Sequence, residues 1–392
     1  MFRTGPDIVL DAKVPAALLS GSGLSLPDLK PVLARLARGA SLSEDEAEAA
    51  FDVVMSGAAT PAQIGALMMG MRVRGESIAE LTGAVRALRR RMLTINAPAG
   101  AIDVCGTGGD QHGTLNVSTA VAFVLAGLGL PVAKHGNRGQ SSPTGGTDVL
   151  LALGVPPLSD LAGLEAQIAR HHVAFLAAPT HHPAMRHAGA IRAELGTRTL
   201  FNLLGPLCNP AGVCLQLVGV FDEAWLQPVA ETLRRLGSQR VWAVHGTDAD
   251  HPGGQGLDEL TLAGPNHVVA LENGALHRFE LTAAMIGLPE APIKAIAGGS
   301  AAHNATALEA LLQGAPGAYR DTVLFNAAAA LCVARGNNMF PPGPDAPGLR
   351  VAMADAARAI DTGSAWQVLA ALRADGLAAA DGMDSMDKEN RA

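Results

Sequence analysis

Hydrophobic residues between positions 28 and 95 recur at the three- and four-residue intervals of an α-helix. Ala47, Phe51 and Val54 share one such face, and Ile64 and Leu67 begin another. Side chains three or four residues apart in a helix lie on the same face. The pattern predicts several short amphipathic helices. Their hydrophobic faces are more extensive than so small a unit can bury, which suggests a partner surface.

Polar residues at the starts of these segments support the same prediction. Ser43–Glu46 and Ser77–Glu80 have the spacing of a capping box, in which the two side chains bind each other's backbone N–H groups. Thr60–Gln63 has it too, with Pro61 at the first helical position, where the missing N–H of proline costs nothing.

After Pro98 and Gly100 the pattern changes to short hydrophobic runs separated by glycine turns and helical segments. We predict strands near residues 102–105, 131–134, 173–177, 213–221, 240–245 and 259–263. This alternation is typical of an α/β domain whose mostly parallel central sheet is flanked by helices. Ligands bind such sheets at the carboxyl ends of the strands.

The chain is accordingly divided into four parts. They are an N-terminal arm at 1–27, a helical domain at 28–95, an α/β domain at 96–378 and a flexible tail at 379–392. The arm is rich in Gly, Ser and Pro, and the tail is polar and charged.

Composition limits the class of protein. Among 392 residues, 48% are hydrophobic and 3% aromatic, so the core must consist mostly of Ala, Leu and Val. A net charge of −7 argues against general binding of nucleic acid. The cysteines lack CxxC spacing, Asp7 and Asp11 interrupt any apolar signal segment, and the hydrophobic run at 120–133 is too short to span a bilayer. We predict a soluble cytoplasmic protein without membrane contact.

The strongest chemical signal lies between residues 106 and 142. GTGGD at 106–110 follows a predicted strand, NVST at 116–119 opens a helix, and KHGNR at 134–138 adds fixed positive charge. Free backbone N–H groups at a helix start bind phosphate oxygens, and cationic side chains strengthen such sites. A tight strand-to-helix turn would explain GTGGD alone. The three segments together predict a site for a multiply phosphorylated ligand.

Two further clusters allow two interpretations each. Asp258 and Glu259 could be solvated at a strand edge, or they could hold Mg²⁺ beside a polyphosphate, with Ser118 supplying a hydroxyl. Arg192 could be a surface charge paired with Glu194, or it could bind a carboxylate through both arms of its guanidinium.

The histidines do not have the spacing of a metal site. His171–His172 and His181–His182 are adjacent pairs whose side chains point in different directions, and no HxxxH segment or cysteine supports them. We interpret His135 and His182 as residues that line a substrate pocket. The chain has no GxSxG segment, so Ser-His-Asp catalysis is unsupported.

Several segments occur in the same order in one known family. They are LSEDEAEAAFDVVMSGAATPAQIGALMMGMRVRGES, the series from GTGGD to SS, FLAAPTHHPAMRHAGAIRAELGTRTLFNLLGPLCNP, VHG with GLDEL, and GAYRDTVLFNAAAAL. Over roughly residues 28 to 375 the chain resembles anthranilate phosphoribosyltransferases, which are pentosyltransferases. The resemblance implies Mg²⁺-dependent transfer of the phosphoribosyl group of phosphoribosyl pyrophosphate to the amino group of anthranilate, in tryptophan biosynthesis. It also implies a helical segment near 185–205 that joins the two domains, and a homodimer formed through the helical domain.

The resemblance also assigns residues to the site, although it implies no single catalytic residue, because catalysis would be electrostatic. The family's donor-binding positions match Gly106, Gly109, Asp110, Thr114, Asn116, Val117, Ser118, Thr119, Lys134, His135, Gly136, Asn137, Arg138, Gly139, Gln140, Ser141, Ser142 and Gly146. For anthranilate the set is Gly106, Asn137 and Arg192, to which we add His135 and His182. The metal positions match Ser118, Asp258 and Glu259.

Three positions depart from the family pattern. Gly146 replaces a small Ser or Ala, Leu151 replaces a common Glu, and the loop Thr247–Gln255 is longer than usual. Only the loop could alter the site, by changing how the segment before the carboxylates closes.

Other functions remain open at this point. Pyrimidine nucleoside phosphorylases share a GTGG turn and a run like Gly145–Thr147, although they resemble the chain poorly at KHGNR and around Arg192. A catalytically silent relative that binds nucleic acid is a second alternative, against which the acidic net charge argues. The same transfer to a different aromatic acceptor is a third.

Overall fold

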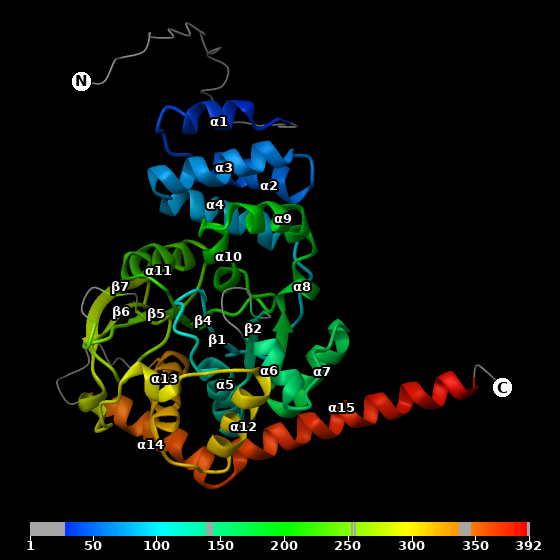
Figure 1. Cartoon of the computed structure of the whole chain (residues 1–392), viewed down its shortest axis with the longest axis vertical. Coiled ribbons are helices and arrows are strands. Elements are labelled where there is room, and N and C mark those ends of the chain that lie inside the picture. The colour runs from blue at the N-terminus through cyan, green and yellow to red at the C-terminus, as the bar shows by residue number, and fades with distance from the viewer. Residues whose placement is uncertain are drawn as a thin grey trace, which may run out of the picture.

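The computed structural model describes residues 28–137, 139, 144–251, 254, 256–336 and 346–389, with side chains up to residue 377. The predicted arm at 1–27 lies outside these residues. The longest helix, α15 (Ser364–Glu389), projects from the body of the molecule (Figure 1), and its backbone continues through most of the predicted tail.

The first part of the chain folds as the helical pattern predicts. It contains α1 (Lys30–Leu36), α2 (Glu44–Met55), α3 (Pro61–Arg74) and α4 (Ile78–Arg89). All three capping boxes are confirmed, with the side chains of Ser43, Thr60 and Ser77 accepting backbone N–H groups at 3.2, 3.3 and 3.2 Å.

Two later helices return to this helical layer. α9 (Arg186–Leu195) packs against α2 and α3, while α10 (Phe201–Leu207) packs against α4. The rings of Phe51 and Phe201 lie 5.4 Å apart between their centroids. Figure 1 shows α9 beside the N-terminal helices and α10 between them and the sheet.

A seven-stranded sheet forms the centre of the larger part, in the order β3-β2-β1-β4-β5-β6-β7. Strands β1 to β5 run parallel and β6 and β7 antiparallel, which confirms a mostly parallel sheet. The strands are β1 (Ile102–Gly106), β2 (Val132–Gly136), β3 (Val173–Ala177), β4 (Leu215–Gly219), β5 (Arg240–Gly246), β6 (Asn266–Glu272) and β7 (Ala275–Leu281).

The strand predicted at 259–263 is wrong. The side chain of Asn266 takes the place of a strand partner there: its Oδ1 accepts the N–H of Thr261 at 2.6 Å, and its Nδ2 donates to the Thr261 carbonyl at 3.0 Å. The chain therefore turns around Asn266 before the β6–β7 hairpin begins. Asn273 and Gly274 join the hairpin with φ values of 51° and 77°, as a tight two-residue hairpin turn requires.

Alternating residues of β1 and β4 enter two hydrophobic clusters, one on each face of the sheet. Val104 and Leu217 belong to the cluster with α5 (Val117–Gly127) and α13 (Ala318–Arg335). Cys105 and Val218 belong to the cluster with the helical layer and α11 (Leu226–Arg235). With both faces covered, the strand ends are left as the place for a site.

The remaining helices complete the outer layers. They are α6 (Gly146–Ala152), α7 (Leu161–His171), α8 (Ala178–His181), α12 (Ala301–Leu312) and α14 (Pro347–Asp361). Within the described residues, no helix combines the length and hydrophobicity needed to cross a membrane.

Candidate functional site

Glycines at the carboxyl ends of β1 and β4 make room for an acidic loop. A Cβ atom on Gly219 would lie 1.4 Å from the Asp258 carbonyl oxygen, and one on Gly106 would lie 2.1 Å from Oδ2 of Asp258. No other residue type fits at either position without moving the backbone or the carboxylate. The sequence therefore places Asp258 directly over the strand ends.

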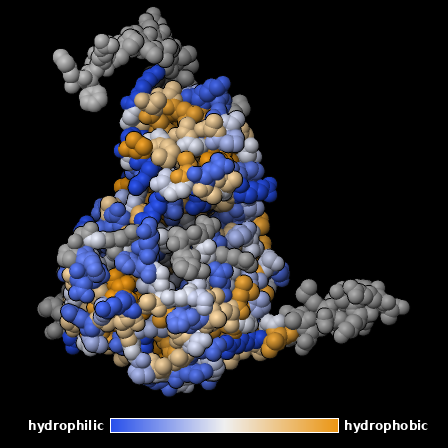
Figure 2. Space-filling view, in the orientation of Figure 1, coloured by the Kyte–Doolittle hydropathy of each residue, from blue (hydrophilic) through white to orange (hydrophobic). Residues whose placement is uncertain are grey.

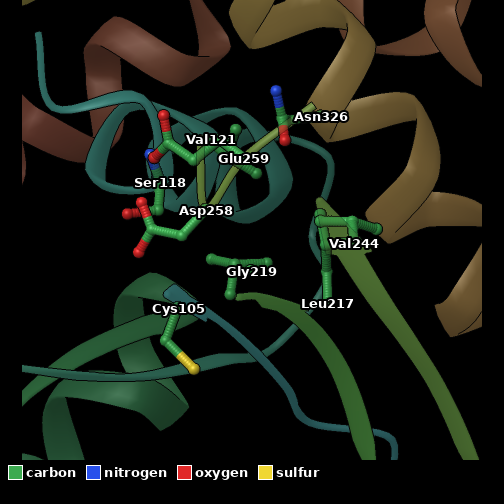
Figure 3. Close-up of a pocket in the computed structure, with 10 residues that line it drawn as sticks. Cys105, Ser118, Val121, Leu217, Gly219, Val244, Asp258, Glu259 and Asn326 are labelled. Atoms are coloured by element: carbon green, nitrogen blue, oxygen red, sulfur yellow. The ribbon is translucent and has the colours of Figure 1, made fainter. Parts of the chain in front are cut away.

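The carboxylates of Asp258 and Glu259 are held there by backbone N–H groups. Oδ2 of Asp258 accepts the N–H of Gly108 at 2.6 Å, and Oε1 of Glu259 accepts the N–H of Ser118 at 3.1 Å. Figure 3 shows the side chains of Ser118, Asp258 and Glu259 together on one side of a small pocket. The strand-end turn and the start of α5 thus meet at the acidic pair.

Among the described residues, no ion pair neutralises the acidic pair, although the charge of Lys134 favours the ionised form of Glu259. Burial raises the pKa of Asp258, to which nearby Asp110 adds, and burial together with Asp258 raises the pKa of Glu259. Oε2 of Glu259 is buried without a hydrogen bond within the described part of the chain. No group of three or more His, Cys, Asp or Glu residues there could hold a metal ion alone. A cation at this place would need further ligands from outside the protein.

Lys134 is a buried positive charge at the end of β2. The residue is only 6% exposed, and no hydrogen bond or ion pair joins its ammonium group to the described residues, although its charge offsets part of the rise in the pKa of Asp103 and of Glu259. It borders a cavity of about 20 Å³ that Thr119, Gly136 and Thr147 also line. Since a buried charge is costly unless it is paired, this ammonium group suits an anionic ligand.

Asp103 on β1 has a role that the sequence did not suggest. It is fully buried, and its Oδ1 accepts the N–H of His135 at 3.1 Å. Burial raises the pKa of this carboxyl group. The carboxylate fastens the end of β2, which carries Lys134 and His135, to the neighbouring strand.

The glycine-rich turn after β1 is shaped by its own backbone. Gly108 and Gly109 have φ values of 67° and 82°, which favour glycine. The N–H of Thr107 donates to the Gly219 carbonyl at 2.9 Å, and the hydroxyl oxygen of Thr107 accepts the N–H of Phe221 at 3.1 Å. Both bonds fix the turn to the end of β4.

His135 and His182 form a buried pair. Their Nε2 atoms are 3.1 Å apart, and Nδ1 of His135 lies 2.9 Å from the Gly205 carbonyl, which can only accept. His135 therefore donates through Nδ1, and its Nε2 accepts from His182. Burial lowers the pKa of His135 to about 3 and the pKa of His182 to about 4, so both rings are neutral near pH 7.

Arg192 lies on α9, in the helical layer. Its Cζ is 5.5 Å from the centroid of the Phe201 ring, and among the described residues no ion pair joins it to Glu194 or to another residue. Burial lowers the pKa of its guanidinium, although arginine stays charged. The pairing with Glu194 that the sequence left open is absent, and no bond among the described residues joins Arg192 to the strand-end site.

The loop after β2 is tied to the start of α6. The N–H groups of Gly139 and Gly145 both donate to Oδ2 of Asp148, each at 2.9 Å. The Asn137 carbonyl accepts the N–H of Thr147 at 3.3 Å, next to Gly146. Arg138, Gln140, Ser141 and Ser142 lie outside the described residues.

Asn116, immediately before α5, accepts hydrogen bonds from two residues in the C-terminal half of the chain. Nδ2 of Asn304 donates to Oδ1 of Asn116 at 2.9 Å, and the hydroxyl of Tyr319 donates to its carbonyl at 3.0 Å. No sequence signal indicated either contact, because both residues are distant along the chain. Around this point the structure brings together Gly106, Ser118, Asp258 and Glu259.

Two family models match the chain. One, described as a glycosyl transferase family a/b domain, covers residues 99–366, and one described as a glycosyl transferase family helical bundle domain covers residues 30–92.

Among curated relatives, the anthranilate phosphoribosyltransferase of Beijerinckia indica is 52% identical over 347 residues, covering 88% of this chain and 97% of the relative. That of Gluconobacter oxydans is 55% identical over 348 residues, covering 88% and 95%. The crystal structure of anthranilate phosphoribosyltransferase from Thermus thermophilus aligns with a TM-score of 0.78 at 37% identity, covering 87% of this chain and 98% of that one. A Saccharomyces cerevisiae anthranilate phosphoribosyltransferase in complex with PRPP and Mg has the same fold, with a TM-score of 0.76 at 24% identity over 89% and 99%.

Proposed function

The chain belongs to the anthranilate phosphoribosyltransferase family, and on this premise we propose which of its residues bind the donor, the acceptor and the metal ion. Its reaction transfers the phosphoribosyl group of phosphoribosyl pyrophosphate to the amino group of anthranilate. The products are N-(5-phosphoribosyl)anthranilate and pyrophosphate, and the step belongs to tryptophan biosynthesis.

The donor lies across the carboxyl ends of β1 and β2. The buried ammonium group of Lys134, which has no hydrogen bond or ion pair among the described residues, is the observation that carries this assignment. The turn at 106–110 and the start of α5 complete the proposed site, where Ser118 and Thr119 supply hydroxyl donors while the N–H groups of Gly108 and Ser118 hold the acidic pair. The described residues of the loop between β2 and α6, which include Asn137 and Gly146, belong to the same proposed site.

Asp258 and Glu259, with the hydroxyl of Ser118, fit a Mg²⁺ ion that the pyrophosphate shares. The fit rests on the buried Oε2 of Glu259, which has no hydrogen bond among the described residues, and on a raised pKa of both carboxyl groups, caused first by burial and then by Asp110 at Asp258 and by Asp258 at Glu259. Mg²⁺ prefers oxygen ligands and often takes several of them from phosphate groups and water. When bound, the ion would offset negative charge on the departing pyrophosphate.

The acceptor lies between this edge and the helical layer. Arg192 binds the carboxylate of anthranilate, because its guanidinium has no competing ion pair among the described residues. Gly106 and Asn137, together with the neutral pair His135 and His182, line the ring pocket.

The chemistry needs positioning more than proton transfer. An aromatic amine is neutral near pH 7 and offers its lone pair directly to C1 of the ribose, and the nitrogen releases one proton to solvent after the N–C1 bond has formed. Lys134 and the backbone N–H groups stabilise the charge that builds on pyrophosphate as the C1–oxygen bond breaks. Arg192 and Asn137 hold the amine in line with C1, so the entropy cost of orienting the two reactants is met on binding and not in the chemical step.

The remaining assignments rest on the same family membership. We propose the domain bounds 28–95 and 96–378, a cytoplasmic location, and a homodimer formed through the helical domain. Val73 on α3 is 82% exposed, and Figure 2 shows hydrophobic atoms interspersed over the helical end of the molecule. A homodimer would bury this exposed hydrophobic surface, and gel filtration with light scattering would test for it.

One fluorescence experiment tests donor, acceptor and metal together. Loss of anthranilate emission would be followed after addition of phosphoribosyl pyrophosphate and Mg²⁺, with EDTA as the control. We expect metal-dependent loss, a rise in the KM for anthranilate alone in Arg192→Ala, and a rise in the KM for the donor in Lys134→Met. A rise of equal size for both substrates in Arg192→Ala would contradict its role, and undiminished turnover in EDTA would contradict the metal assignment.

A further inference from the structure

Residues 296–304, here called the clasp segment, touch both loops that the proposed function assigns to the donor. The N–H of Leu115 donates to the Ile296 carbonyl at 2.9 Å, and the N–H of Gly298 donates to the Gly113 carbonyl at 2.8 Å. On the other side, the hydroxyl of Thr144 donates to the Gly299 carbonyl at 2.7 Å. A single short segment therefore ties the turn before α5 to the loop before α6.

The clasp segment lies so close to the turn that its backbone has no room for a side chain. A Cβ atom on Gly298 would lie 2.6 Å from the Thr114 carbonyl oxygen and 2.8 Å from that of Gly113. The last residue of the segment, Asn304 in α12, is only 2% exposed and makes both bonds of its amide group within this region.

The orientation of two amide groups follows from one backbone N–H. The N–H of Gly299 donates at 2.8 Å to Asn304, so the atom that it meets must be the oxygen, Oδ1. The nitrogen of Asn304 then faces Asn116 at 2.9 Å, and since this nitrogen only donates, Asn116 must present its own Oδ1. Nδ2 of Asn116 consequently points away from Asn304, and no hydrogen bond joins it to the described residues.

We propose that Asn304 is a positioning residue for the phosphoribosyl donor, which turns the amide of Asn116 so that its N–H₂ group meets donor oxygens. This inference rests on the proposed donor site. The oxygens of a phosphoribosyl pyrophosphate accept hydrogen bonds and carry negative charge. An Asn116 amide turned the other way would present Oδ1 to them and repel them. Asn304 thus selects the productive one of two amide orientations that differ little in shape.

Two substitutions of Asn304 distinguish control of the Asn116 amide orientation from a purely structural role of Asn304. In Asn304→Asp, one carboxylate oxygen still accepts the N–H of Gly299. The other oxygen can only accept a hydrogen bond, so Asn116 must turn its amide and present Nδ2 instead of Oδ1. In Asn304→Ala, both bonds are lost and Asn116 is free to turn. A purely structural residue would tolerate the isosteric Asp better than Ala. Orientation control predicts the opposite order for the donor KM.

The test is steady-state kinetics of full-length protein with phosphoribosyl pyrophosphate, Mg²⁺ and anthranilate. We expect Asn304→Asp to raise the donor KM about tenfold or more, the effect of one lost hydrogen bond to a charged group. Asn304→Ala should raise it less, and the anthranilate KM should stay within about twofold in both. Gln313→Glu, at the exposed C-terminal end of the same helix, is the charge-matched control and should behave as the wild type.

A second pair of variants distinguishes the possible failures. In an Asn116→Ala background, Asn304→Asp and Asn304→Ala should have equal donor KM values, because no amide remains to turn. A persisting difference would show direct charge repulsion and overturn the proposal, as would a smaller effect of Asp than of Ala in the wild-type background. If Asn116→Ala alone left the donor KM unchanged, the proposed donor site would itself be wrong.

Discussion

The buried histidine pair predicts that acid destabilises this protein in a defined range. Burial, the repulsion between His135 and His182, and the nearby charges of His181 and Lys134 lower the pKa of His135 to about 3, from an ordinary 6.5. Burial lowers the pKa of His182 to about 4, with His181 adding to it. The folded protein therefore keeps both rings neutral at pH values at which the unfolded chain protonates them.

The sign and size of the effect follow from this difference. Stability from the neutral pair is complete above pH 6.5 and is lost as the pH falls toward the folded values. Each pH unit in that range costs about 1.4 kcal/mol per ring, so the interval from pH 6.5 to pH 5 costs about 2 kcal/mol per ring. The two rings together would lower the free energy of unfolding by about 4 kcal/mol at pH 5.

Urea unfolding at pH 7.5 and pH 5 measures this loss, and His182→Gln isolates it. Glutamine keeps an N–H for Nε2 of His135 and does not titrate, so the variant should lose about 2 kcal/mol less than the wild type between the two pH values. His277→Gln, on exposed β7, is the matched control and should lose as much as the wild type. Equal losses in wild type and His182→Gln would refute the reasoning.

Two further predictions concern stability and the strand-end site. Glu80 is fully buried and forms hydrogen bonds with Arg74 and with the N–H of Leu42. Glu80→Gln should therefore lower the free energy of unfolding by about 3 kcal/mol in a urea titration, and an unchanged midpoint would contradict a structural role for the Arg74–Glu80 pair. Gly219→Ala would place a Cβ atom 1.4 Å from the Asp258 carbonyl oxygen, so this variant should lower kcat about a hundredfold or more in the fluorescence assay. Gly189→Ala, at a position on α9 where a Cβ atom has no neighbour within 4 Å, should leave kcat unchanged.

Local signals predicted local structure well. The capping boxes at Ser43, Thr60 and Ser77 involve only four consecutive residues, so the sequence contains everything that they need. The region from 259 to 281, where a strand was predicted at 259–263 and the β6–β7 hairpin was not, shows the opposite case. Leu260 and Leu262 are buried as strand residues would be, but the side chain of Asn266 bonds to the backbone between them and prevents a strand. The Asn273-Gly274 pair was the available hairpin signal.

The site was predictable to the extent that each residue acts alone. Lys134, Asp258 and Glu259 belong to segments whose composition indicates phosphate or metal binding without knowledge of their neighbours. Asp103 and Asn304 act by fixing other residues that are distant in sequence or in a neighbouring strand. Their roles appear only once β1 lies beside β2 and the clasp segment lies beside α5.

On the proposed assignment, the buried charges at the strand ends would allow catalysis without a proton-transferring residue. Among the described residues, Lys134 is buried without an ion pair and Oε2 of Glu259 is buried without a hydrogen bond, although the charge of Lys134 offsets part of the rise in the pKa of Glu259. Each arrangement destabilises the free protein, since a buried charge is costly until it is paired. A ligand that brings phosphate oxygens and Mg²⁺ together satisfies both at once. The electrostatic field is therefore already in place before the C1–oxygen bond breaks, so little reorganisation is needed as charge develops on the leaving group.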